Sequence, residues 1–185
     1  MTSNQNRLWT VEEYHRMIDV GILTTEDKVE LLNGYIIQIN PQPPIHAAIL
    51  QQATDHIKTL LTGKAYVRMQ LPVTLPTSEP EPDIAIVKID LQAYRNYHPS
   101  ASDIFLLIEV AYSSLEVDKI IKVPIYAQAN IPEYWILDTN TRQVYIYRQP
   151  TTSGYGQKII LPANASITLL AFPEITVNFA DLFLP

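Results

Sequence analysis

IFLLIEVAY, residues 104–112, is an almost uninterrupted apolar run of the length of one strand. Large aliphatic and β-branched side chains fill it, as is typical of a strand that is covered on both faces. We therefore predict that residues 104–112 form a central strand and that the other elements are arranged around it. Its one charged residue is Glu109.

Downstream of this run, the sequence predicts one helix and then several strands. Ser113 and Glu116 have the spacing of a capping box, so we expect a helix at 115–129. Pro124 has no amide donor and should kink or split this helix. The short strands expected after it are EYWILD (133–138), QVYIYR (143–148), QKIIL (157–161) and ITLLAF (167–172).

Upstream of the run, two local signals stand out. Thr10 and Glu13 form a capping-box pattern, which predicts a helix that continues to about Val20. Asn33-Gly34 lies between apolar runs and predicts a tight hairpin. The remaining upstream expectations are a helix over residues 45–60 and strands over residues 66–75 and 84–87.

This order of elements predicts an α/β fold of the α+β kind, with a mixed sheet flanked by helices. An N-terminal helix and a hairpin precede the sheet. The chain has 185 residues and no linker-like or repetitive tract, so we expect a single domain spanning residues 1–185.

Composition restricts the possible functions. The chain has 13 Lys and Arg against 19 Asp and Glu, for a net charge of −6, so any contact with nucleic acid must be local or assisted by a metal. The absence of cysteine excludes disulfides, thiolate metal sites and cysteine nucleophiles. Neither a signal peptide nor a membrane span is recognisable, and we expect a cytoplasmic protein with no membrane partner.

Two carboxylates are candidates for chemistry. An ionised Glu109 in an apolar strand is costly unless it is paired or coordinates a cation. Asp83 follows Pro82 at the start of the strand expected at 84–87, so two strands can present both groups together. Because neighbouring carboxylates repel each other, they would share a proton or bind a divalent metal. Oxygen ligands favour Mg²⁺ or Mn²⁺.

Two lysines on the following helix can approach these carboxylates. Lys119 and Lys122 lie three residues apart and therefore on one helix face. Lys122 is also four residues from Asp118, a spacing that allows an ion pair. An ammonium group near the carboxylates would offset negative charge that develops on a phosphate.

The ordered set of motifs resembles the Uma-type restriction endonuclease family of the PD-(D/E)XK nuclease superfamily. The set comprises Pro82-Asp83, Ile108-Glu109-Val110 and VDKIIKVPIYAQANIPEYWILD (117–138). Upstream, VELLNGYIIQINPQPPIHAAIL (29–50) resembles the first hairpin and helix of that family. The resemblance runs from about Leu8 to Leu184 and implies a restriction-endonuclease-like fold.

The resemblance also implies a reaction. Asp83 and Glu109 would be ligands of Mg²⁺ or Mn²⁺, the Val110 carbonyl a further ligand, and Lys122 the catalytic lysine, with Lys119 as the alternative. The substrate would be DNA. Family members resemble one another in forming dimers, and cutting a duplex needs two sites, so we expect a homodimer. Two further residues match family positions and are auxiliary candidates: Glu30 and His46.

Two departures from the family pattern bear on activity. Ala111 stands where the superfamily has its lysine, although the Uma-type family places that lysine on the next helix. The segment AYSSLEV (111–117) is one residue shorter than the usual turn, which would shift the helix relative to the carboxylates.

The sequence leaves alternatives open for each residue. Glu109 can be an acid satisfied by a structural partner, Asp83 a turn cap, and Lys122 a solvated residue paired with Asp118. His46 alone is more often a packed or capping residue than a ligand, and Glu30 is equally consistent with an exposed strand charge.

Two alternative functions also stay open. One is a nuclease fold that has lost catalysis and binds nucleic acid or protein. The other is an enzyme that uses the two carboxylates as acid and base, for example on a glycoside. If Glu109 has no structural partner, Glu109→Ala should abolish activity and stabilise the metal-free protein.

Overall fold

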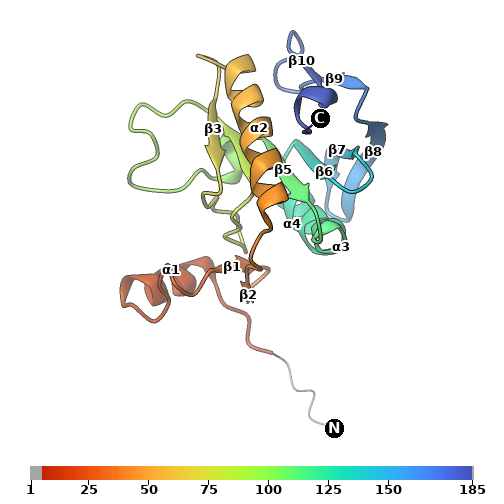
Figure 1. The fold of residues 1–185 in the computed structure, drawn as a ribbon. Helices are drawn as coiled ribbons and strands as arrows, with labels where there is room; N and C mark the ends of the chain where they lie inside the picture. The colour runs from red at the N-terminus through yellow and green to blue at the C-terminus, as the bar shows by residue number, and fades with distance from the viewer. Residues whose placement is uncertain (1–5, 185) are drawn as a thin grey trace.

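The centre of the computed structural model, which describes residues 6–184, is a six-stranded mixed sheet in the order β3-β4-β5-β6-β7-β8 (Figure 1). Only β5 and β6 are parallel, and every other neighbouring pair is antiparallel. The strands are β3 (Tyr66–Met69), β4 (Ile84–Val87), β5 (Ile104–Ala111), β6 (Glu133–Asp138), β7 (Gln143–Thr151) and β8 (Gly154–Pro162). The predicted mixed sheet is confirmed.

β5 is an inner strand of this sheet, as its apolar sequence predicts. Seven of its eight residues are buried, because other parts of the chain cover both of its faces. Alternate side chains point to opposite faces of a strand. Leu106, Ile108 and Val110 join the core on one face, whereas Leu107 and Ala111 join the core on the other, which is also the side of Glu109.

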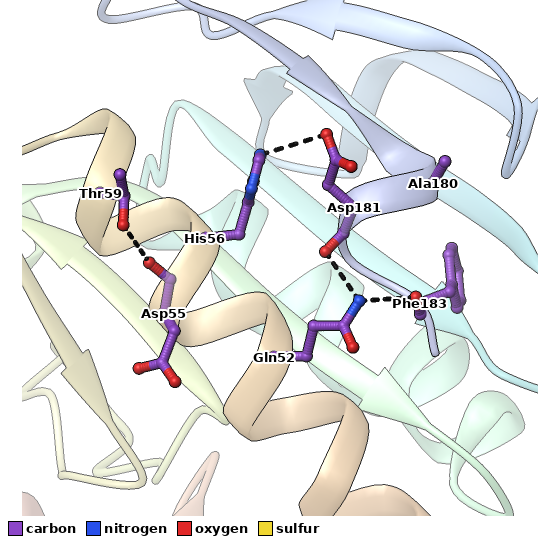
Figure 2. A pocket seen from close by; sticks show the side chains of 7 residues that line it. All are labelled: Gln52, Asp55, His56, Thr59, Ala180, Asp181 and Phe183. Atoms are coloured by element: carbon purple, nitrogen blue, oxygen red, sulfur yellow. Dashed lines mark hydrogen bonds and ion pairs between the residues drawn. The ribbon is translucent and has the colours of Figure 1, made fainter. Parts of the chain in front are cut away.

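Helix α2 (Pro44–Leu60) covers the first of these faces (Figure 1). Its apolar stripe includes Ile49, Ala53 and Ile57, and the helix packs against β3 and β5. The C-terminal segment extends this layer and is attached to α2 by Gln52, whose amide donates to the backbone carbonyls of Asp181 and Phe183 at 3.1 and 2.7 Å (Figure 2). This segment contains β9 (Ser166–Thr168), β10 (Thr176–Asn178) and η3 (Phe179–Asp181).

A second helical layer covers the opposite face. It consists of α3 (Leu115–Val117), the π-helical turn η2 (Asp118–Lys122) and α4 (Val123–Gln128). The predicted helix is confirmed in its extent, and its break lies in the turn before Pro124. The predicted capping box of Ser113 and Glu116 is wrong, because Ser114 is the N-cap and its hydroxyl donates to the Asp118 carboxylate at 2.8 Å instead of to the helix backbone.

The N-terminal elements follow their local sequence signals. α1 (Val11–Asp19) begins with the predicted capping box of Thr10 and Glu13. β1 (Val29–Leu32) and β2 (Tyr35–Gln38) form the predicted hairpin. Asn33 and Gly34 both have positive φ, at 47° and 80°, as a tight two-residue turn requires.

Two strands are shorter than predicted. β3 ends at Met69 rather than near residue 75, because Gln70 has a left-handed backbone (φ 49°) and Pro72 follows. In the run 167–172, only the beginning is extended, as part of β9. No helix within residues 6–184 has the length and apolarity needed to span a bilayer.

Candidate active site

The register between β4 and β5 brings two carboxylates together. Ile84 pairs with Ile108, so Asp83 lies beside Glu109 at this end of the strand pair. The amide of Asp83 faces Oε2 of Glu109 at 3.4 Å, and the amide of Val110 donates to Oδ2 of Asp83 at 2.8 Å. Both carboxylates are almost fully buried.

Lys122 reaches this pair from the helical layer. Its ammonium group donates to Oε1 of Glu109 at 3.0 Å and lies 3.8 Å from Oε1 of Glu30 and 4.0 Å from Oδ1 of Asp118. The lysine is only 7% exposed, so these carboxylates rather than bulk water surround its charge. Lys122 is therefore part of the carboxylate cluster and not a solvated partner of Asp118 alone.

The π-helical turn η2 determines where Lys122 points. Its wider hydrogen bonding is visible at the end of the turn, where the amide of Val123 donates to the carbonyl of Asp118, five residues back. A π turn accommodates one extra residue per turn and occurs often at functional sites. Asp118 and Lys122 are the two buried residues of this turn, and both face the cluster.

Lys119, the alternative lysine, lies elsewhere. Its ammonium group is 4.1 Å from the centre of the Tyr145 ring and 3.7 Å from the exposed Glu116 carboxylate. The structure thus brings Lys122, and not Lys119, to the two carboxylates.

His46 and Glu30 complete the set of sequence candidates, and both join the cluster. His46 lies in the first turn of α2 and its Nε2 is 3.0 Å from Oδ2 of Asp83. Glu30 lies on β1, and its Oε2 accepts the amide of Glu81 at 3.2 Å. Both side chains are buried.

Sequence reasoning missed several contacts. The hydroxyl of Tyr126 donates to Oε1 of Glu109 at 3.0 Å, and its position four residues after Lys122 was the available signal. The amides of Gln42 and Gln70 lie 3.4 and 3.3 Å from Oδ1 of Asp83. These glutamines come from loops, where no periodic pattern indicates their direction.

Burial and charge set the protonation tendencies of the cluster. Burial raises the pKa of Glu109 well above its ordinary value, and nearby Asp118, Asp83 and Glu30 add to this despite the attraction of Lys122. The pKa of Lys122 is raised as well, because the charges of Glu109, Glu30 and Asp118 outweigh its burial.

Asp83 behaves differently. Burial acts to raise its pKa, but the hydrogen bond and charge of His46, the amide of Val110 and the charge of Lys122 together lower it. Asp83 is therefore held as a carboxylate, the form that a metal ligand needs.

The donor set fits a hard divalent cation. Glu30, Asp83, Glu109 and Asp118 are four buried carboxyl groups around one lysine and one histidine, so acidic groups outnumber basic ones. Within residues 6–184, no three His, Asp or Glu side chains are arranged as a metal cage. Mg²⁺ does not need one, since it keeps several waters and takes one or two carboxylates together with substrate phosphates.

A mixed sheet that pairs Asp83 with Glu109, with a lysine from the next helix beside them, defines a protein of restriction-endonuclease-like fold. The chain belongs to the Uma2 family, described as "Putative restriction endonuclease", whose sequence model matches residues 11–180. The predicted family and fold are therefore confirmed.

One solved structure supports the same fold. The chain is similar to a protein from Anabaena variabilis described as "a putative nuclease belonging to DUF820". The two chains share 20% sequence identity, with a TM-score of 0.72 over 94% of this chain and 97% of the other. None of the curated proteins compared with the chain matches it.

Proposed function

We propose that the protein is an endonuclease that depends on Mg²⁺ or Mn²⁺ and hydrolyses phosphodiester bonds of DNA. The observation that carries this proposal is the cluster itself, in which Lys122 lies 3.0 Å from Glu109 and Glu109 lies beside Asp83. Membership of the Uma2 family supports the same reaction class.

In this proposal, Asp83 and Glu109 would hold the metal, and the Val110 carbonyl would add a ligand. Bound there, Mg²⁺ would lower the pKa of a water and screen the charge of the phosphate. The cation also addresses the problem that a chain with a net charge of −6 must approach a polyanion.

The surrounding residues have distinct roles in the proposed reaction. Lys122 orients the attacking water and offsets negative charge on the phosphate. His46 keeps Asp83 ionised and fixes its orientation through their 3.0 Å contact. Tyr126 holds the carboxylate of Glu109 from the helix side.

The alternative functions have less support. The main argument for a degenerate binding module was the short 111–117 turn, but Lys122 lies at the carboxylates despite it. Two-carboxylate chemistry on a glycoside gives no role to a buried lysine bonded to Glu109. A homodimer stays part of the proposal because cleavage of both DNA strands needs two sites.

Nicking of supercoiled plasmid in Mg²⁺, in Mn²⁺ and in EDTA tests the proposal. The wild type should nick only with metal, and Asp83→Asn should not nick under any condition. Asp55→Asn, on the exposed side of α2, is the matched control and should nick like the wild type. Metal should also raise the melting temperature of the wild type but not of Asp83→Asn.

Nicking that persists in EDTA, or in Asp83→Asn after purification by the same protocol, would contradict the proposal. Size-exclusion chromatography coupled to light scattering tests the homodimer separately. A monomer at assay concentration would remove that part of the proposal and leave the reaction class intact.

A further inference from the structure

A cavity of about 560 Å³ is lined in part by Gln42 and Gln70, two residues that contact Asp83. Its walls come from α1, from the segment that leads into β1 and from the segment after β2, and its apolar part includes Ile18, Leu23, Ile39 and Pro41. This volume lies in the range of cavities that hold small organic ligands.

Two glutamines connect the cavity to the carboxylate cluster. Gln42 and Gln70 line the cavity, and both amides also approach Oδ1 of Asp83, at 3.4 and 3.3 Å. They bond to each other as well, since Nε2 of Gln70 donates to Oε1 of Gln42 at 2.8 Å. Two side chains of the cavity lining therefore contact a carboxylate that the proposed reaction uses.

The backbone of Gln70 is fixed in an unusual conformation at the cavity wall. Its φ of 49° is the left-handed conformation that non-glycine residues rarely adopt, and its amide donates to the carbonyl of Asp83 at 3.1 Å. Strained backbone of this kind persists where the surroundings hold it, often at binding sites.

The chemistry of the lining favours a neutral, flat heterocycle. Apolar walls bind the faces of a ring, and glutamine and asparagine amides form hydrogen bonds with base edges. Asn40 supplies another amide to the lining. Lys28 and Glu81 give the lining one charge of each sign, so the lining has no net positive charge to attract a phosphate.

We propose that this cavity receives one unpaired nucleobase next to the phosphodiester that is cleaved, so that the preferred substrate is single-stranded nucleic acid or a duplex with an unpaired nucleotide. This inference rests on the proposed function and narrows its substrate class. A base inside a regular duplex is stacked and paired and cannot enter a pocket without being extruded, which costs free energy.

Three labelled DNA oligonucleotides of one sequence test the inference: a single strand, a blunt duplex and a duplex with one bulged nucleotide. The wild type should cut the single strand and the bulge at least about tenfold faster than the duplex, since a base stacked or held in a pocket contributes energy of this order.

A pair of tryptophan substitutions links the preference to the cavity. Leu23→Trp should fill the cavity and reduce cleavage of the single strand by about tenfold. Ile22→Trp is the matched control, because Ile22 is 68% exposed and outside the cavity lining, and it should cut like the wild type. Both variants should keep the metal-dependent rise in melting temperature, which shows that they fold and bind metal.

Binding measured without cleavage separates this inference from the proposed function. Fluorescence of 2-aminopurine at the bulged position, titrated with Lys122→Met in Mg²⁺, should change on binding, and a second Leu23→Trp substitution should remove the change. Equal cutting of all three substrates, with Leu23→Trp indistinguishable from Ile22→Trp, would overturn the inference while leaving the nuclease. Base-dependent binding with no cutting by the wild type would uphold the cavity and overturn the reaction.

Discussion

The ammonium group of Lys122 lies 3.0 Å from Oε1 of Glu109, although the two residues are thirteen positions apart and on different elements. The π-helical turn Asp118–Lys122 buries its first and last residues, Asp118 and Lys122, on the side of the carboxylates.

The two lysines of this helix give a matched test of the site. Lys122→Met should reduce metal-dependent plasmid nicking by at least about a hundredfold, because it removes the charge that faces the reacting phosphate. It should also lower the free energy of unfolding by about 3 kcal/mol, since Glu109, Glu30 and Asp118 lose their counter-charge. Nicking rates and urea unfolding measure the two effects.

Lys119→Met is the control for this pair. Its ammonium group contacts Tyr145 and Glu116 away from the carboxylates, so nicking should stay close to the wild-type rate and stability should change by less than about 1 kcal/mol. If Lys119→Met lost activity and Lys122→Met kept it, the lysine assignment would be wrong.

Glu109 gives a second pair of variants. The sequence alone suggested that Glu109→Ala stabilises the metal-free protein, but the contacts with Lys122 and Tyr126 change this expectation. Glu109→Ala leaves both donors without their acceptor and should cost about 3 kcal/mol. Glu109→Gln keeps an acceptor oxygen and removes a charge that burial disfavours, so it should stay within about 1 kcal/mol of the wild type.

Urea unfolding in EDTA measures this difference, and both variants should be inactive in plasmid nicking. The addition of Mg²⁺ should stabilise the wild type and neither variant. Equal losses of stability in Glu109→Ala and Glu109→Gln would mean that the hydrogen bonds to Lys122 and Tyr126 contribute little.

Local signals predicted most of the fold because they act within a few residues. Thr10 and Glu13 cap α1 through contacts three residues apart, and Asn33-Gly34 forms the hairpin turn on its own. The extent of β3 depended instead on the left-handed backbone at Gln70, whose amide bonds to Asp83, thirteen residues away. Such long-range contacts leave no periodic pattern in the sequence.

The sequence predicted those residues of the candidate site that are charged and lie in or next to an apolar strand. Asp83 and Glu109 stand out because charge is unusual beside apolar strands, and strand register brings them together. Tyr126 offered only its spacing from Lys122 as a signal, and a tyrosine on a buried helix face is ordinarily part of the core. The direction of Lys122 required the π turn, which depends on tertiary packing of the helix against the sheet.

Substitution of Gly34 tests how much the close contact between the hairpin and the N-terminal segment contributes to stability. Its φ is 80°, and a Cβ there would lie 2.8 Å from Cβ of Leu8 and 3.1 Å from the carbonyl of Trp9. Gly63 has a similar φ of 74° but open space around it, so it isolates the cost of backbone strain. Gly63→Ala should cost about 1 kcal/mol, and Gly34→Ala at least about 1 kcal/mol more.

Thermal unfolding of the two variants measures the difference. Because β1 carries Glu30, Gly34→Ala should also weaken plasmid nicking, whereas Gly63→Ala should not. Equal melting temperatures would mean that the N-terminal segment moves aside without cost.

The raised pKa of Tyr14 predicts that the stability of the protein falls at alkaline pH. Its hydroxyl donates to the carbonyl of Val29 at 3.0 Å, and burial, with the charges of Glu81, Glu79 and Glu30, raises its pKa from 10.0 to about 12. A phenol whose pKa is raised by folding contributes stability below its unfolded pKa and loses it as pH rises through the folded value. The stability that Tyr14 contributes should therefore be lost between about pH 10 and pH 12.

Tyr14→Phe removes this titration together with the hydrogen bond to Val29. At about pH 8 the variant should be less stable than the wild type by about 1 kcal/mol, the contribution of one hydrogen bond. At about pH 11 ionisation of Tyr14 stabilises the unfolded state of the wild type. The difference in stability between wild type and variant should therefore shrink or vanish. Urea unfolding at both pH values measures it, and a constant difference would show that Tyr14 ionises equally in the folded and unfolded states.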